Sequence, residues 1–138
     1  MNTSRKTNGM DRKVLLSTLW IFVVLNMLYC DVVSLMDAGL LKQYLSGTVG
    51  GMEFTQGYLL GAGIWMAVLI AMVLLSRVLP YRPNRWANII VGILATVVQC
   101  ATLFIGRPAM YYLFFSILEM AGTASIVWFA LKWRNPEG

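Results

Sequence analysis

Long apolar runs separated by short polar segments dominate the pattern of this chain. Four such runs fill most of its 138 residues, at Val14–Met36, Phe54–Ser76, Trp86–Gly106 and Met110–Leu131. Each is close to the ~20 residues that a helix needs to cross the hydrocarbon core of a bilayer. None shows the period-two alternation of a β-barrel strand. The pattern therefore predicts an all-α integral membrane protein, an antiparallel bundle of four transmembrane helices.

The connection between the first two runs is the longest and carries a helical pattern of its own. Leu40, Leu41, Tyr44 and Leu45 fall at i, i+1, i+4 and i+5, which places them on one face of a short helix. Gly47 is expected to end that helix. We expect it to be an interfacial helix that lies along the outer membrane surface.

Proline and glycine mark the other two connections. Two prolines stiffen the segment before Asn84, and Asn84 is placed to cap the third helix. A tight turn through Gly106 is predicted to join the third and fourth helices. Pro108 would then lie in the first turn of the fourth helix, where its missing N–H costs nothing. So short a connection makes these two helices antiparallel neighbours.

We interpret the chain as a single domain. The four runs and their connections form one transmembrane unit at residues 14–134. The polar residues 1–13 are expected to be disordered and cytoplasmic, and residues 135–138 to form a short cytoplasmic tail.

The basic residues are distributed unevenly between the two sides of the predicted bundle. Nine of the eleven lie on one side, and only Lys42 and Arg107 fall on the other. This asymmetry is the positive-inside signal, and it places both termini in the cytoplasm. A composition of 59% hydrophobic and 12% charged residues is unlike that of a soluble domain. The expected partner is therefore the lipid bilayer.

A net charge of +5 can also indicate a nucleic-acid partner. Here the basic residues flank membrane spans and are not interleaved with aromatic residues on a soluble face. We expect no nucleic acid.

The two cysteines and the absence of histidine limit the chemistry of the chain. Cys30 and Cys100 do not form a C-x-x-C pair, and no histidine is present to bind zinc or haem. We expect no metal and no cofactor. Because Cys30 and Cys100 lie at similar depths, a disulfide and two buried free thiols both remain open, and the free thiols are favoured.

Glu119 is the main candidate for a functional residue. It lies roughly 14 Å from the outer end of the fourth run, deep in the bilayer. An ionised, unpaired carboxylate there costs at least ~2.5 kcal/mol. The side chain must therefore be protonated, paired, or exposed to water inside the bundle. Tyr112 and Ser116 share its helix face, which is consequently unlike a lipid-facing surface.

Other polar residues place the candidate site in the outer half of the bundle. Asn26 in the first run and Gln99 in the third reach nearly the depth of Glu119, and Asp31 lies further out. The inner half of the spans is interpreted as almost entirely apolar. We therefore predict a ligand-binding cavity that opens outward. The alternative is a polar plug that fixes helix register.

Small residues indicate where helices approach closely. Gly57 and Gly61 form a G-x-x-x-G step in the second run, and Gly122 lies on the face that carries Glu119. In lipid, such residues allow close backbone packing. Gly57 and Gly61 are expected to pack inside the bundle, with a homo-oligomer seam as the alternative.

Three segments resemble a known family. Leu28–Asp37, Asn84–Ile93 and Tyr111–Glu119 are similar to an uncharacterised bacterial family of small four-span membrane proteins, itself distantly similar to the DoxX-like group. The resemblance implies a four-helix protein of the bacterial inner membrane. It implies no established activity and no catalytic residues.

Three functions are compatible with this pattern. The leading hypothesis is a protein that binds, or helps to move, a small apolar or lipid-like molecule in an outward-facing pocket centred on Glu119. The first alternative is a structural or accessory subunit that assembles through its helices. The second is an intramembrane enzyme in which Glu119 transfers a proton on an apolar substrate.

Overall fold

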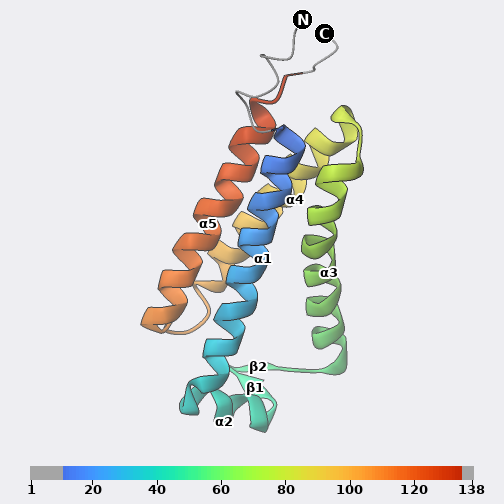
Figure 1. The fold of residues 1–138 in the computed structure, drawn as a ribbon. Coiled ribbons are helices and arrows are strands. Elements are labelled where there is room, and N and C mark those ends of the chain that lie inside the picture. Colours follow the sequence, from blue (N-terminus) through green and yellow to red (C-terminus); the bar gives the residue numbers. More distant parts are fainter. Residues whose placement is uncertain (1–10, 135–138) are drawn as a thin grey trace, which may run out of the picture.

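The computed structural model describes residues 11–134, which form five helices and a two-stranded hairpin (Figure 1). The elements are α1 (Arg12–Met36), α2 (Ala38–Ser46), β1 (Thr48–Val49), β2 (Met52–Glu53), α3 (Gln56–Val78), α4 (Tyr81–Thr102) and α5 (Met110–Leu131). Helices α1, α3, α4 and α5 are each long and apolar enough to cross a membrane. The predicted all-α architecture with four spans is confirmed.

Short polar side chains set the starts of three helices. The Asp11 carboxylate accepts a hydrogen bond from the backbone N–H of Lys13 at 3.2 Å and thereby caps α1. Asp37 accepts from Gly39 N at 2.9 Å at the start of α2. The hydroxyl of Thr55 plays the same role for α3. Each cap satisfies a backbone donor that has no partner within the helix.

The short helix expected between the first two spans is present as α2. It ends at Gly47, whose φ of 79° is in the left-handed region that glycine adopts without strain. Beyond Gly47, the strands β1 and β2 pair antiparallel, with Thr48 opposite Glu53. That α2 lies along a membrane surface remains a prediction.

Several predicted boundaries are wrong. α1 already begins at Arg12, so the expected disorder of residues 1–13 does not extend to its last two residues, and residues 1–10 and 135–138 lie outside the described part of the chain. α4 begins at Tyr81, which places Asn84 inside the helix and not at its cap. The first turn of a helix tolerates a proline such as Pro83, because the N–H groups there have no partner within the helix.

The connection between α4 and α5 is also longer than predicted. α4 ends at Thr102 and α5 begins at Met110, so residues 103–109 replace the tight turn. Pro108 precedes the N-cap Ala109 and does not enter the first turn of α5.

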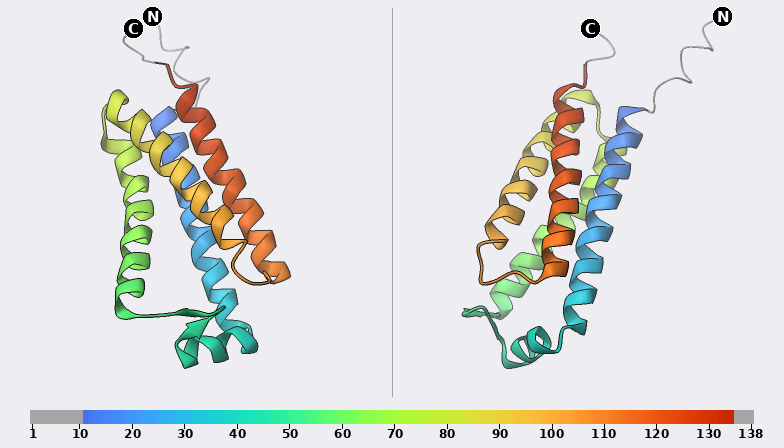
Figure 2. Two further views of the ribbon diagram at one scale, coloured as in Figure 1. Left: turned by 180° about the vertical axis from the view of Figure 1, so that it is seen from behind. Right: turned by 90° about the vertical axis from the view of Figure 1, so that its left-hand side faces the viewer.

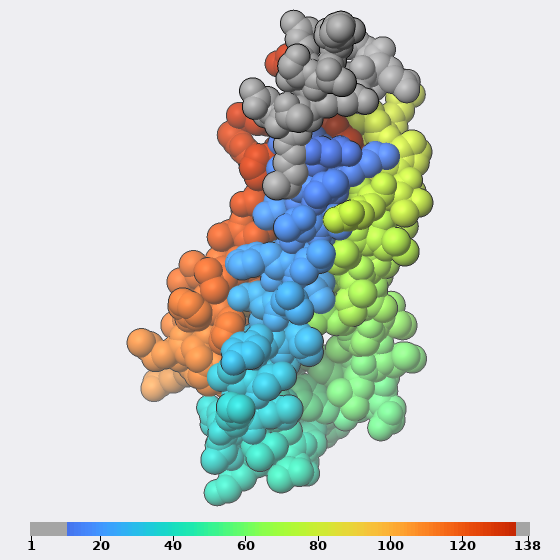
Figure 3. Space-filling view, viewed as in Figure 1, coloured from blue at the N-terminus to red at the C-terminus, as the bar shows by residue number. Residues whose placement is uncertain are grey.

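α1 is the central helix of an open bundle. α5 packs along one side of α1, α3 packs along the other side, and α4 packs against α5 (Figures 1 and 2). The space-filling view shows α1 at the surface between α5 and α3 (Figure 3). We call the half of the bundle at the start of α1 and the end of α5 the proximal half, and the opposite half the distal half.

The hydrophobic core lies in the proximal half. Leu16 and Trp20 of α1, Leu69 of α3, and Ile126 and Ala130 of α5 are all completely buried there. All four spanning helices therefore pack tightly only over the half of the molecule that carries the chain ends.

A buried polar network also lies in the proximal half, so the prediction of an almost entirely apolar inner half is wrong. The Asn88 side-chain oxygen accepts from Trp20 Nε1 at 2.7 Å and from Ser76 Oγ at 3.2 Å. Its Nδ2 donates to Asn84 O and to Asn84 Oδ1, at 2.8 and 2.7 Å. Asn84 Nδ2 donates in turn to Ser76 O at 2.7 Å. These bonds join α1, α3 and α4.

The small residues differ sharply in how they pack. A Cβ added at Gly122 would lie 2.7 Å from Cγ2 of Val23, so α5 and α1 cross closely at this glycine. Gly61 has no atom within 4 Å of an added Cβ, and Gly57 has only its own helix neighbour Thr55. Gly57 and Gly61 therefore do not pack inside the bundle, contrary to the favoured interpretation.

The two cysteines do not pair in this structure. Cys30 is a buried free thiol on α1, and Cys100 is a partly buried free thiol on α4. The sulfur of Cys100 lies 3.4 Å from the sulfur of Met120 on α5. Both thiols therefore belong to the packing of the spanning helices.

Candidate functional site

One face of α3 passes from fully buried to exposed along the length of the helix. Residues spaced by three and four positions define this face: Tyr58, Ala62, Trp65, Leu69, Met72 and Ser76. Leu69, Met72 and Ser76 are at most 2% exposed, Trp65 is partly buried, Ala62 is exposed, and Tyr58 is 44% exposed. This face is buried in the proximal half of the bundle and exposed in the distal half. We infer that α3 separates from the bundle beyond Trp65. We call the distal part of this face, at Tyr58, Ala62 and Trp65, the distal opening.

The segment before α3 holds its distal end away from α1. In Figures 1 and 2 the chain runs from β2 across the end of the bundle to the start of α3. The Phe54 ring stacks on Tyr44 of α2 at 5.7 Å and on Tyr58 of α3 at 5.0 Å, measured between ring centroids. This aromatic stack connects α2 to α3 and defines the rim of the distal opening.

Glu119 points from α5 into the middle of the bundle. Its neighbours on one side contact α1, since the backbone oxygen of Phe115 accepts from Asn26 at 2.9 Å. Its neighbours on the other side contact α4, since the Ser116 hydroxyl accepts from Gln99 at 2.7 Å. Glu119 therefore faces the gap between α1 and α4, which α3 covers in the proximal half and leaves uncovered in the distal half.

The carboxyl of Glu119 is buried in the bundle and is not neutralised by a basic side chain among residues 11–134. The residue is only 4% exposed. The side chain of Asn26 hydrogen-bonds to the carboxyl, and the charge of Asp31 also acts on it; both residues are on α1. The Asn26 Nδ2 also donates to the backbone oxygen of Phe115. A carboxylate can accept about four hydrogen bonds, so the carboxyl keeps acceptor capacity that Asn26 does not use.

Trp65 brings a buried polar group without a partner to a similar position along its helix, and it was not expected from the sequence. Its indole Nε1 is the one buried side-chain nitrogen or oxygen without a hydrogen-bond partner in the part of the chain that the structure describes. Trp65 lies nine residues into α3 and Glu119 nine residues into α5. Both are thus about 14 Å from the distal ends of their helices. The spacing of the α3 face was the available signal for Trp65.

The remaining predicted site residues form the wall between α4 and α5. Gln99 donates to Ser116, and the Tyr112 hydroxyl donates to Thr102 Oγ1 at 2.8 Å. These side chains satisfy one another across the helix interface. They are brought close to Glu119, but their hydrogen bonds are already used to hold α4 against α5.

Asp31 lies in the distal half of α1. It is exposed at the surface of α1, and its charge acts on Tyr44 of α2. Burial raises the pKa of the Tyr44 hydroxyl above its usual value, and the Asp31 carboxylate raises it further. α2 therefore carries a partly buried phenol within electrostatic reach of Asp31.

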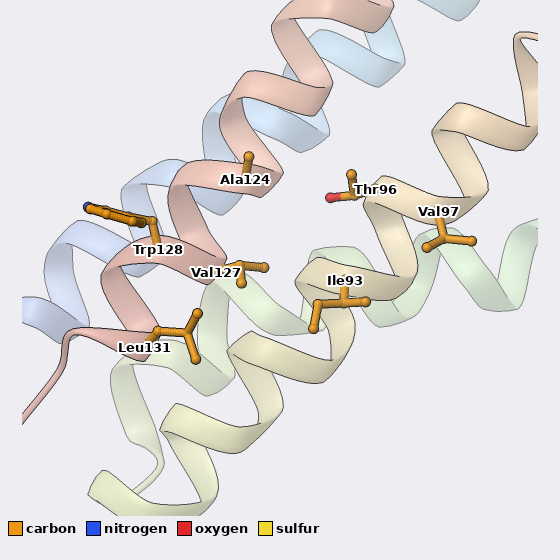
Figure 4. A pocket seen from close by; sticks show the side chains of 7 residues that line it. All are labelled: Ile93, Thr96, Val97, Ala124, Val127, Trp128 and Leu131. Atoms are coloured by element: carbon orange, nitrogen blue, oxygen red, sulfur yellow. The ribbon is translucent and has the colours of Figure 1, made fainter.

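Two apolar grooves on the molecular surface lie outside the polar cluster formed by Asn26, Gln99, Tyr112, Ser116 and Glu119. One, of about 510 Å³, runs along the exposed side of α1 and touches the cluster only at Asn26. The other, of about 300 Å³, lies between α4 and α5 (Figure 4). Within residues 11–134, no three His, Cys, Asp or Glu side chains gather in a way that would hold a metal ion.

Comparison with known proteins identifies a family but no function. A model of a family of unknown function, DUF6326, matches residues 7–138. The chain belongs to this family. No curated protein and no solved structure matches the chain. For this DUF6326 member, a bacterial origin and a relationship to the DoxX-like group remain predictions.

Proposed function

We propose that the chain binds a small, mostly apolar or lipid-like molecule in the distal opening, with Glu119 as its polar anchor. The observation that carries this proposal is the buried Glu119 carboxyl, which no basic side chain among residues 11–134 neutralises and whose acceptor capacity Asn26 uses only in part. A buried polar group that lacks a hydrogen-bond partner costs about 1–3 kcal/mol, so such groups are almost always paired. A bound molecule would supply a further partner.

Two polar groups define the class of ligand. The Trp65 indole can only donate, whereas the Glu119 carboxyl can accept and, when protonated, also donate. A ligand that carries a hydroxyl, carbonyl or amine could therefore bind to either group. Tyr58 and Ala62 lie on α3 between its distal end and Trp65, and they present an aromatic ring and a methyl group. The rest of the ligand is therefore expected to be apolar.

A photoreactive long-chain alcohol tests this proposal. After irradiation in lipid nanodiscs and digestion, we expect labelled peptides from α3 near Trp65 and from α5 near Glu119. Ala62→Trp should fill the distal opening and reduce this labelling about tenfold, equivalent to ~1.4 kcal/mol of binding. Ala71→Trp, on the exposed side of the same helix, should leave it unchanged.

The outcome that contradicts binding is equally clear. Labelling spread evenly over the lipid-facing surface, and unaffected by Ala62→Trp, would show that no site exists at the distal opening. Transport of the molecule, as distinct from binding, would further require that a reconstituted protein accelerate its passage between leaflets.

Assembly with another copy is a second candidate, supported by the two bare glycines on α3. Gly57 and Gly61 are exposed, and no atom of another helix lies within 4 Å of a Cβ added at either, as expected of a close helix–helix seam that the single chain leaves unfilled. Gly61→Leu should then abolish crosslinked dimers in nanodiscs. A purely monomeric wild type would exclude this role.

Proton transfer on a bound apolar substrate is a third candidate. Asp31 and Glu119 interact electrostatically, which gives the site two acids on neighbouring helices. Glu119→Gln keeps the shape of the side chain but removes the proton. Binding of the alcohol probe that survives this substitution would favour binding without chemistry.

We also propose that both termini are cytoplasmic and that the distal opening faces outward in a bacterial inner membrane. The described basic residues of the proximal end support this orientation: Arg12, Lys13, Arg77, Arg82, Arg85, Lys132 and Arg134. A C-terminal alkaline phosphatase fusion should be inactive, and an active fusion would overturn the orientation.

A further inference from the structure

The proximal groove between α4 and α5 has no role in the proposed function. It has a volume of about 300 Å³ and is lined by Ile93 and Val97 of α4 and by Ala124, Trp128 and Leu131 of α5, together with two other residues. Figure 4 shows Val127 and Leu131 of α5 directed toward α4, and Trp128 directed away from α4 near the end of α5.

Packing at Gly92 produces the groove. A Cβ there would lie 2.7 Å from Cγ2 of Val127, so the two helices are in close contact at this point and diverge beside it. The hydroxyl of Thr96, also in the lining, is engaged at 2.8 Å with the backbone oxygen of Gly92 and at 2.8 Å with Thr123 Oγ1. The lining is therefore apolar, and its hydroxyl already has hydrogen-bond partners.

Two cationic side chains, Lys132 and Arg85, lie at the proximal end of the groove. The Lys132 ammonium lies 4.1 Å from the centroid of the Trp128 ring. Arg85 donates from Nε to Ala130 O at 3.0 Å and from Nη2 to Leu131 O at 3.2 Å, which fixes its guanidinium at the end of α5. Its remaining donors are free to bind an anion.

This positive charge has little compensation at the proximal end. Among the residues that the structure describes there, Asp11 is the one acid, and it caps α1 through the N–H of Lys13. An aromatic ring beside a basic side chain at the end of a spanning helix is typical of the headgroup level of a bilayer. Anionic headgroups at this level attract lysine and arginine.

We propose that this groove binds one anionic phospholipid of the proximal leaflet, independently of the distal opening. Its acyl chain would lie along Ile93 and Ala124, and its phosphate would contact Lys132 and Arg85. The positive charge at the proximal end favours a lipid over a second copy of the chain. A second copy would bring the same uncompensated cations to the interface, whereas an anionic lipid neutralises them.

Native mass spectrometry of protein released from nanodiscs tests the charge requirement. In an equimolar mixture of phosphatidylglycerol and phosphatidylcholine, the wild type should retain phosphatidylglycerol preferentially. Lys132→Gln should reduce this preference about fivefold, the factor that one basic residue contributes near an anionic surface. Lys42→Gln, at the distal end, removes the same charge and should have no effect.

A second pair of variants tests the groove itself. Ala124→Phe fills the space for the acyl chain and should abolish retention, whereas Ala71→Phe adds the same ring to the exposed side of α3 and should preserve it. If Ala124→Phe does not fold, Val97→Phe fills the groove from α4 and carries the same expectation. Equal retention of both lipids by the wild type, or equal retention by the α3 and groove variants, would overturn the proposal.

Discussion

Asn88 uses every hydrogen-bonding position of its side chain. Its oxygen accepts from Trp20 and Ser76, and its two N–H groups donate to Asn84. A fully satisfied buried network specifies one arrangement of the helices that contribute to it. The proximal network therefore fixes α1, α3 and α4 relative to one another, and it has nothing left with which to bind a ligand.

Removal of the Asn88 amide should destabilise the protein. Asn88→Ala leaves the indole N–H of Trp20 and the hydroxyl of Ser76 without their acceptor, which costs about 1–3 kcal/mol. The measurement is the midpoint of thermal unfolding in detergent. Ile90→Ala, a truncation on the exposed side of the same helix, should lower the midpoint less. Equal midpoints for the two variants would contradict the structural role of the network.

The polar residues of the candidate site could be found from the sequence, but their partners could not. Glu119, Asn26 and Gln99 stand out because lipid makes each of them costly. Which group each one contacts depends on how α1, α4 and α5 rotate about their axes, and Asn26 proves to bind a backbone oxygen. The sequence does not identify Trp65 as a site residue, because an indole in an apolar span is ordinarily a packing or interfacial residue.

At the scale of elements, the existence of the helices follows from the apolar runs, whereas their ends depend on local chemistry. Gly47 ends α2 as predicted, because its left-handed φ is free of strain in glycine. Pro83 predicts a loop by itself, but the first turn of a helix accepts proline, and Pro83 lies in the first turn of α4. Asn84 is therefore inside α4, where it forms the proximal network with Asn88 at a spacing of one helical turn.

The docking of α2 should depend on alkaline pH through Tyr44. Burial, assisted by the Asp31 carboxylate, raises the pKa of this hydroxyl above its ordinary value of 10.0 in the folded state. The folded state therefore holds the phenolic proton more tightly than the unfolded state does. The resulting stabilisation is complete below pH 10 and is lost as the pH rises through the higher pKa of the folded state.

The difference between the wild type and Tyr44→Phe isolates this effect. Unfolding midpoints measured from about pH 9 to about pH 12 should fall more steeply for the wild type, because the phenylalanine has no proton to lose. Parallel curves would show that the Tyr44 hydroxyl does not contribute to the docking of α2.

At the scale of the whole molecule, the chain combines a closed proximal half with an open distal half. The core and the polar network hold all four spans together near the chain ends, and the aromatic stack through Phe54 sets the distal end of α3 apart. Such a division suits a protein that admits a ligand from one side of the membrane. Four spans without a second closing half suit binding better than transport by a single copy.

The central claim is that the buried Glu119 carboxyl, which no basic side chain among residues 11–134 neutralises, is reachable from the lipid through the distal opening. Dicyclohexylcarbodiimide tests it directly, since this apolar reagent adds to a protonated carboxyl and the adduct rearranges to a stable N-acylurea. Treatment in nanodiscs should modify Glu119, detected by peptide mass spectrometry. The modification should be absent in Glu119→Gln, strongly reduced in Ala62→Trp, and retained in Ala71→Trp. An unmodified Glu119 in the wild type, or equal modification in both tryptophan variants, would contradict the account.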